Sequence, residues 1–270
     1  MLCAPFILGF LVFFVLPFSL TLYYSFTTAG CFTGLFNYKA IYSSALFRLA
    51  AWNTAAFYLA ALPLITALSL GIALLIKWIP RGNTFKLSLL FPMMLPIAST
   101  VMVMDIFFSD KGFLNQFLIG LGLPVADWLN SPVSFWVLVG LYLWKNTGYN
   151  VILLLSGLYM IPAEYYDYGK IEGAGPLQSF RYITLPALRP TLFFTLLVSL
   201  IGAYKCFREA YLIAGKYPPD SIYLLQHFMN NNFESMNYPR LSASAVTMTA
   251  AIALGLLVFL LISKRGRRRP

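Results

Sequence analysis

The sequence predicts an all-α integral membrane protein with about six transmembrane helices. Of its 270 residues, 60% are hydrophobic and only 10% are charged, whereas a typical soluble domain has about 45–50% apolar and about 25% charged residues. The hydrophobic residues also gather in long runs with almost no charge, and about 20 such residues suffice for one helical bilayer span. These two observations exclude a soluble globular fold, because a chain of this length cannot hide that much apolar surface from water.

Six apolar runs justify the six spans. The first is interrupted by Pro17, and the second contains Asn53 and Pro63. The fourth contains one charge, Lys145. The fifth has the shortest charge-free stretch, so we expect it to begin before Arg189, whose long side chain reaches the interface. A single transmembrane domain then covers residues 1–270, with spans at residues 4–26, 51–76, 87–108, 133–159, 185–205 and 241–263.

Basic residues predict the orientation of these spans. The last seven residues include five Lys or Arg, which places the C-terminus in the cytoplasm by the positive-inside rule. With six spans, the N-terminus and the loop at residues 160–186 lie on the same side. Segments on that side carry eleven positive charges, and the outer segments carry seven that are offset by five acids. The first span lacks the basic start and cleavage site of a signal peptide, and a truncated start is one explanation.

Composition and spacing argue against several other classes of protein. The net charge is +10, but the basic residues lie beside apolar runs, so membrane lipid is an expected partner and nucleic acid is not. The three cysteines show no C-x-x-C spacing, and the single His227 excludes an H-E-x-x-H zinc site. We expect no metal, cofactor or catalytic residue in this chain. We expect His227 to be solvated in an outer loop.

The inner loop at residues 160–186 is longer than a simple connection needs, and such loops are usually functional. Glu164 and Asp167 suit the N-terminal end of a helix, where the helix dipole favours acids. Gly173 to Pro176 ends that helix, because Gly readily takes the left-handed conformation and Pro cannot continue the run. A second short helix is expected over residues 176–182. The loop is therefore predicted to form a helix-turn-helix on the cytoplasmic surface.

The surface of this predicted loop combines aromatic and very small residues. Tyr165, Tyr168 and Glu172 share one face of the first helix by their three-and-four spacing. Four small residues around the turn leave the backbone bare, namely Gly169, Gly173, Ala174 and Gly175. Such a surface lets another protein approach closely. The alternative is an amphipathic helix that rests on lipid headgroups.

The spacing within the loop resembles that of the binding-protein-dependent ABC transporter permeases. Their cytoplasmic loop has the pattern E-A-A-x3-G-x9-I-x-L-P, and the matching residues here are Asp167, Tyr168, Gly169, Gly173, Ile183 and Pro186. Asp-Tyr-Gly replaces the Glu-Ala-Ala triplet. Residues 161–165 and 171–175 also look like the carbohydrate branch of this family, and residues 32–38 resemble its F-x-G-L-x-N-Y outer segment. The resemblance extends over most of the chain.

The resemblance implies a type I ABC importer fold and an importer of sugars or oligosaccharides in a bacterial or archaeal cell membrane. Such a chain pairs with a second, homologous permease to form the translocation path. Two separate ATPase subunits use the ATP and Mg, and an extracytoplasmic solute-binding protein delivers the solute. The loop at residues 160–186 corresponds to the coupling helix. This chain has no G-x-x-x-x-G-K-[ST] phosphate loop, so we expect ATP hydrolysis in another subunit.

A stripe of polar residues marks one face of the fourth predicted span, comprising Tyr142, Lys145, Asn146, Tyr149 and Asn150. Polar side chains within a span are costly and usually face the bundle interior. A sugar has many hydroxyl groups and an apolar ring face, which amide, amine and aromatic groups can bind together. The stripe is thus a candidate translocation path. The alternative is that these residues only form hydrogen bonds between helices and hold the bundle together.

Two other functional classes were compared with the importer. An ion-coupled or proton-coupled transporter or channel needs acids inside its spans, but Asp105 is the only one near a span interior. An intramembrane enzyme needs a histidine at depth, and no predicted span contains one. Other polar residues are expected to be structural: Asn53 and Thr54 in the second span, and a small-residue stripe of Thr191, Thr195, Ser199 and Gly202 in the fifth.

Overall fold

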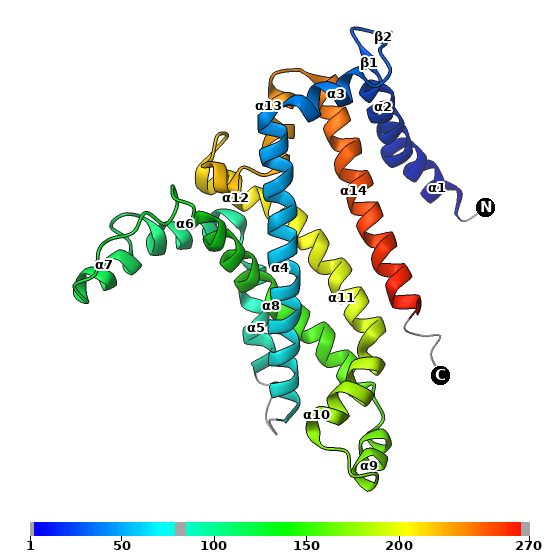
Figure 1. Ribbon diagram of the computed structural model, residues 1–270, viewed down its shortest axis with the longest axis vertical. Helices are drawn as coiled ribbons and strands as arrows, with labels where there is room; N and C mark the ends of the chain where they lie inside the picture. The colour runs from blue at the N-terminus through cyan, green and yellow to red at the C-terminus, as the bar shows by residue number, and fades with distance from the viewer. Residues whose placement is uncertain (1–2, 79–84, 266–270) are drawn as a thin grey trace. The chain divides into compact units, whose positions relative to one another are not determined.

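The computed structural model describes residues 3–78 and 85–265. The predicted connector around Arg81 and the end of the basic tail, Arg267 to Arg269, lie outside the described residues. Most of the described chain is helical (Figure 1). It divides into two compact units, Met1–Thr54 with Tyr223–Pro270 and then Ala55–Ile222. The long helix α4 (Ala45–Trp78) begins in the first unit and continues in the second.

The first unit is built around the C-terminal helix α14 (Tyr238–Arg265), which packs against α2, α3 and α13. Its other elements are α1 (Ala4–Phe10), the π-helical segment η1 (Leu11–Val15), α2 (Leu16–Ser25), β1 (Thr27–Thr28), β2 (Cys31–Phe32), α3 (Phe36–Ser43) and α13 (Leu225–Glu234). The π segment ends two residues before Pro17. A wider turn is expected there, because proline lacks the N–H that an α-helix needs.

A two-residue turn joins β1 to β2, which pair antiparallel as Thr27 with Phe32 and Thr28 with Cys31. Its central residues Ala29 and Gly30 both have positive φ, at 51° and 81°, which is typical of a type I′ hairpin. Asn37 holds this hairpin against the end of α2, because its Nδ2 donates to the carbonyl oxygens of Ser25 and Thr27. The first predicted span thus ends in a corner where Ser25, Thr27 and Asn37 are buried and joined by hydrogen bonds.

The second unit is built around α8 (Ser134–Tyr159), which packs against α5 and α11. Its other elements are α5 (Phe85–Met94), α6 (Ile97–Phe108), α7 (Phe113–Gly120), α9 (Ala163–Ile171), α10 (Pro176–Ser179), the π-helical segment η2 (Phe180–Thr184), α11 (Leu185–Lys205), α12 (Phe207–Ala214) and the 3-10 turn η3 (Asp220–Ile222). An apolar core joins the ends of α4, α8 and α11 and includes Ala73, Ile76, Leu154, Leu158 and Leu188.

Four helices in the described part of the chain are long and apolar enough to cross a membrane: Ala4–Ser25, Ala45–Lys77, Pro176–Ala214 and Tyr238–Leu261. A fifth is added if the bent pair Ser88–Met94 and Ile97–Gly120 counts as one span. Helix α8 has 26 residues, which is about 39 Å and long enough to cross. It is less apolar because its centre carries Lys145, Asn146 and Asn150. The count of six spans stays a prediction.

The third predicted span, residues 87–108, is not one continuous helix. The two parts of the bent pair meet at an angle of 102° across the break between Met94 and Ile97. Pro96 stands at the break with φ −55° and ψ 147°, an extended conformation. Proline has no N–H to donate, and it disfavours the helical conformation at the residue before it. The break follows from this local chemistry.

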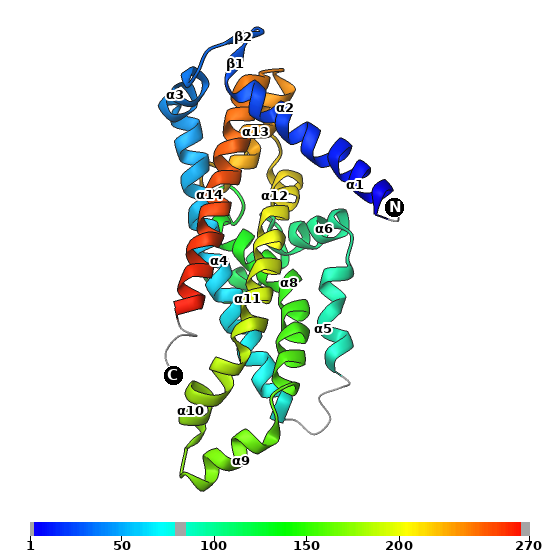
Figure 2. The same cartoon turned by 90° about the vertical axis from the view of Figure 1, so that its right-hand side faces the viewer.

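The fifth predicted span, residues 185–205, coincides with α11. The short helix expected over residues 176–182 is present as α10 and η2, but no break separates it from α11, and the helix is continuous from Pro176 to Ala214, over 39 residues (Figure 2). The π-helical segment η2 lies directly before Pro186, and the Leu185 N–H bonds to the carbonyl oxygen of Phe180. This wider turn accommodates the proline without ending the helix. The second half of the inner loop is therefore a direct extension of α11.

Candidate functional site

The inner loop presents helix α9 with its aromatic face exposed. Tyr165 is 54% exposed and Tyr168 is 66% exposed. Glu164 lies in the first turn, where its charge suits the helix dipole as predicted. Asp167 lies in the second turn instead, and its Oδ1 is 3.0 Å from the Nζ of Lys170 in a solvent-exposed ion pair. Exposed pairs of this kind add only a few tenths of a kcal/mol.

The turn after α9 has the predicted glycine conformation. Gly173 has φ +78°, and its N–H donates to the Lys170 carbonyl oxygen at 3.0 Å. The Ala174 N–H donates to the Gly169 carbonyl oxygen at 2.8 Å. These two bonds form a Schellman motif, which satisfies the last carbonyl groups of the helix. The next helix then starts at once, and the Gly175 N–H donates to Gln178 Oε1.

Gly169 is half-buried and lies against the second half of the loop, whereas the sequence predicts bare backbone at this position. A Cβ built on Gly169 would lie 2.9 Å from Ile183 Cδ1 on η2. Gly169 therefore allows the two halves of the loop to pack closely. Gly173 and Gly175 differ, because a Cβ at either position would meet nothing within 4 Å in the described residues. Of these three glycines, only Gly173 and Gly175 have free space beside the backbone.

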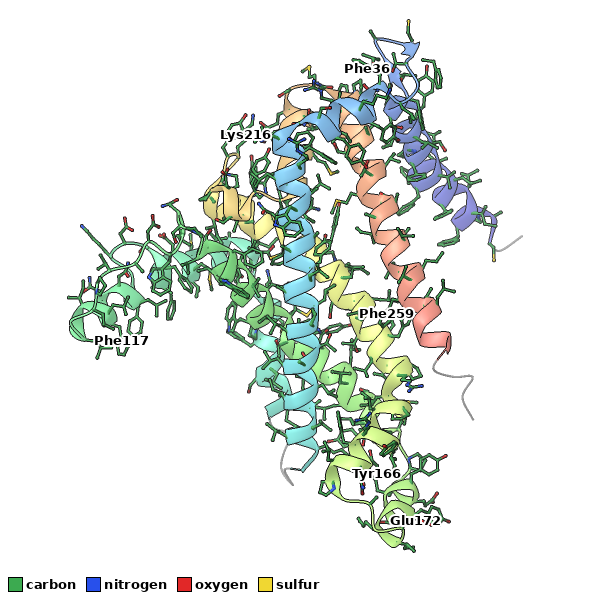
Figure 3. All side chains as sticks on the ribbon, in the orientation of Figure 1. Phe36, Phe117, Tyr166, Glu172, Lys216 and Phe259 are labelled. Carbon is green, nitrogen blue, oxygen red and sulfur yellow. The ribbon has the colours of Figure 1, made fainter. Side chains whose placement is uncertain are left out.

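Tyr166, which the sequence did not single out, fixes the loop to the bundle. The Nζ of Lys77, at the end of α4, lies 4.5 Å from the centre of the Tyr166 ring and 3.4 Å from its hydroxyl oxygen. The same hydroxyl group is 3.0 Å from Oγ1 of Thr184 on η2. The Tyr166 ring also packs against the apolar core around Leu158. Figure 3 shows Tyr166 nearer the long helices and Glu172 nearer the tip of the loop.

A shallow hollow of about 450 Å³ lies between α9 and the start of α11. It brings together Tyr165, Tyr168, Ile183 and Pro186, four of the predicted loop residues, with Tyr182 and Ala187. Its walls are mainly aromatic and apolar. Tyr166 and Gly169 lie on the other side of α9, which faces the bundle. Their spacing of three residues in the sequence predicts that they share this face.

The polar stripe on α8 separates into two groups with different partners. The Tyr142 hydroxyl group donates to the Ser199 carbonyl oxygen at 2.7 Å, and Asn150 Nδ2 donates to Ser199 Oγ at 2.7 Å. Both side chains are buried. These two residues join α8 to the buried small-residue stripe on α11, as the helix-packing alternative predicts. Both are bonded within the bundle, and Tyr142 also lines the cavity described next.

Lys145 and Asn146 form the second group and line a cavity. Lys145 Nζ is 2.7 Å from Oε1 of Glu209 on α12, and both side chains are nearly buried. Asn146 lies opposite Gly202, where an added Cβ would be 3.2 Å from Asn146 Oδ1. The cavity has a volume of about 160 Å³ and is lined by Met93, Ile97, Leu141, Tyr142, Lys145, Asn146, Gly202, Lys205, Cys206, Arg208 and Glu209. Tyr149 is not among these lining residues.

Glu209 is the residue that sequence reasoning missed in this cavity. It was counted with the acids of the outer segments, but it is only 7% exposed. A lysine within a span needs a partner, because an unpaired buried charge is costly. That requirement could have indicated a nearby acid. It could not identify which one, since 64 residues separate Lys145 from Glu209.

Three other polar residues lie in the first unit. Asn53 Nδ2 donates to the Tyr223 carbonyl oxygen at 3.1 Å, and the Leu225 N–H donates to Thr54 Oγ1 at 2.8 Å, so both are structural as predicted. The prediction that His227 is solvated is wrong. Its side chain is fully buried, and its Nδ1 accepts the Leu224 N–H. Burial lowers the pKa of His227 to about 4, so the ring is neutral near pH 7.

Comparison with known proteins agrees with this architecture. The family model described as "Binding-protein-dependent transport system inner membrane component" matches residues 80–269. The arabinooligosaccharides transport system permease protein AraP of Bacillus subtilis is 30% identical over 81% of this chain and 72% of its own length. The probable ABC transporter permease protein YesP of the same organism is 32% identical over 96% of this chain and 87% of its own.

A similar fold occurs in a solved structure. A chain of a bacterial ABC transporter involved in the import of the acidic polysaccharide alginate superposes with a TM-score of 0.83. The alignment covers 97% of this chain and 93% of that one, at 21% sequence identity. The order of helices described above is thus that of a known transport protein subunit.

Proposed function

Since this chain belongs to the binding-protein-dependent transport system inner membrane components, we propose that it is the permease subunit of an ATP-driven importer of sugars or oligosaccharides. Membership of this family decides against the ion-coupled transporter and channel considered from the sequence. The sugar class is supported by the similarity to AraP, which is named as an arabinooligosaccharides transport permease. The carbohydrate-like residues of the inner loop agree with this class.

The inner loop at residues 160–186 is the proposed coupling element between this permease and separate ATPase subunits. The observation that carries the proposal is the position of Tyr166 between Lys77 on α4 and Thr184 on η2. Through these contacts and the continuous helix from Pro176 to Ala214, a force on α9 reaches two spans directly. The exposed Tyr165 and Tyr168 form the surface offered to the ATPase.

The proposed arrangement has both termini and the coupling loop in the cytoplasm. A second, homologous permease completes the translocation path, and an extracytoplasmic solute-binding protein delivers the solute from outside. The family description names binding-protein-dependent transport, which supports such a partner. The excess of basic residues at the predicted inner segments supports the orientation.

Uptake measurements test the proposed function. Cells with and without this gene are given a panel of radiolabelled neutral and acidic sugars and oligosaccharides. We expect uptake of at least one of them to disappear without the gene and to return when the gene is restored. A matched strain that carries an ATPase-subunit deletion should show the same loss. Unchanged uptake of every sugar, with loss of an amino acid or an ion instead, contradicts the proposal.

A further inference from the structure

We propose that the cavity between α8 and the end of α11 selects solutes with a negative charge, so that the imported sugar is an acidic one. This inference rests on the proposed function of sugar import and adds the chemical class of the solute. Membership of the family does not determine the charge of the solute. The side chains that line the cavity provide the evidence.

The cavity has more positive than negative charge. Its lining contains Lys145, Lys205 and Arg208 but only one acid, Glu209. Lys145 and Glu209 neutralise each other across 2.7 Å. Lys205 and Arg208 are exposed to solvent, and neither forms an ion pair within the described residues. The cavity therefore keeps two positive charges that are not balanced by its own acid.

Two unbalanced cations favour an anionic ligand over a neutral one. A cleft with charge of one sign raises the local concentration of ions of the opposite sign. The guanidinium group of Arg208 offers parallel N–H donors that match a carboxylate, sulfonate or phosphate group, and Lys205 adds a point charge three residues away. A neutral sugar gains neither interaction. The pair is therefore expected to discriminate by charge.

Glu209 indicates that the ligand also carries hydroxyl groups. Its Oε1 is bonded to Lys145, but its Oε2 is buried and has no hydrogen-bond partner in the described part of the chain. A buried carboxylate oxygen needs a donor, because losing water without a replacement is costly. A hydroxyl group of a bound sugar would supply this donor. An anion without donors, such as a simple sulfate, would not.

The broken third span supports a ligand role for the same cavity. Met93 and Ile97 line it, and they lie on either side of the break at Pro96. Non-helical backbone at membrane depth is tolerated where it lines a water-filled cavity or is buried in protein. The volume of about 160 Å³ equals roughly five water molecules at ~30 Å³ each. That space suits one acidic group and part of its sugar ring.

The test measures uptake by cells that express the complete transporter. The probes are a radiolabelled uronic acid disaccharide, a sugar phosphate and a sulfonated sugar, each paired with a neutral counterpart, such as the methyl ester of the uronic acid. We expect at least one acidic probe to enter in a gene-dependent manner and its neutral counterpart to enter at least about tenfold more slowly. The permease contribution is then isolated with the double variant Lys205→Gln and Arg208→Gln.

The double variant should raise the KM for the acidic solute by about tenfold or more, because hydrogen bonds to charged groups are worth more than neutral ones. The matched control is Lys111→Gln, an exposed outer lysine outside the cavity, which should leave KM unchanged. An unchanged KM in the double variant overturns the inference. Gene-dependent uptake of neutral sugars alone also overturns it but leaves the proposed function intact. If no sugar, acidic or neutral, shows gene-dependent uptake, both the inference and the proposed function are wrong.

Discussion

Tyr166 links three helices through a single hydroxyl group and ring. Its neighbours Tyr165 and Tyr168 are exposed. The three tyrosines of α9 therefore lie in two different environments, with Tyr166 bonded to the bundle and the other two facing solvent. Of the three, only Tyr166 forms hydrogen bonds to α4 and η2 within the described residues. Under the proposed coupling role, we therefore expect the inward Tyr166 to transmit movement and the exposed tyrosines to meet the ATPase.

Replacing Tyr166 by Phe is expected to loosen the loop without removing its ring. The change deletes the bonds to Lys77 and Thr184, and each such bond contributes about 0.5–1.5 kcal/mol. The purified transporter should show a lower melting temperature and weaker stimulation of ATP hydrolysis by solute. Tyr217→Phe, at an exposed tyrosine outside the loop, is the matched control and should change neither quantity. Equal behaviour of the two variants would show that Tyr166 does not transmit the movement.

Gly173 tests the shape of the turn. Leu at this position must adopt φ +78°, which costs about 1–2 kcal/mol for a residue with a Cβ, and its side chain would project from the open end of the turn. We predict that Gly173→Leu abolishes uptake while the permease still inserts in the membrane. Gly173→Asn is the control, because Asn tolerates this conformation better. Normal transport by Gly173→Leu with its ATPases attached would disprove the coupling role.

His227 is expected to make the stability of the first unit depend on pH. Its pKa is about 4 in the folded protein, below the ordinary value of about 6.5. The unfolded chain therefore binds the proton first as pH falls, and stability decreases from about pH 6.5 down to about pH 4, by up to about 1.4 kcal/mol per pH unit. Thermal unfolding of wild type and His227→Gln across this range checks it. Parallel pH profiles of the two proteins would contradict the prediction.

At the scale of elements, prolines explain the break in the third predicted span and the π-helical turn at the start of the fifth. Pro96 breaks the third span, whereas Pro186 leaves the fifth intact because η2 widens the turn before it. The same residue type thus has opposite effects. Sequence alone indicates that a proline disturbs a helix, but packing decides between a break and a local π turn.

The contact between α5 and α8 depends on one glycine. A Cβ at Gly148 would lie 1.6 Å from the Leu89 carbonyl oxygen, whereas a Cβ at Gly140 on the same helix would meet nothing within 4 Å in the described residues. Gly148→Ala should therefore force the helices apart and cost at least about 1–3 kcal/mol. Gly140→Ala should be neutral or slightly stabilising, because Ala favours a helix. Melting temperatures of the two purified variants provide the comparison, and equal values would disprove this packing.

At the scale of the whole molecule, the proposed topology is open to a labelling experiment. Cys3, Cys31 and Cys206 are first replaced by Ser, and single cysteines are then placed at the exposed positions Leu177 and Ser235. An impermeant thiol reagent applied to intact cells should label Ser235→Cys and not Leu177→Cys. Permeabilised cells serve as the control, and both sites should react there. The reverse pattern in intact cells would invert the proposed orientation.

The sequence by itself determined the membrane class, the positions of most helices and the turn at Gly173. These features depend on local chemistry: apolar runs of bilayer length, the conformational freedom of glycine and the missing N–H of proline. The family could also be identified from the spacing of the inner loop.

Only the tertiary structure decided which polar residues meet. Lys145 pairs with Glu209, and Tyr142 and Asn150 bond to Ser199. His227 is buried although it lies in a polar segment that is predicted to be outside the membrane spans. These partners are far apart along the chain, and burial depends on what packs against a residue after folding. A periodic pattern defines which side chains share a face of one helix. The pattern does not predict which other helix packs against that face.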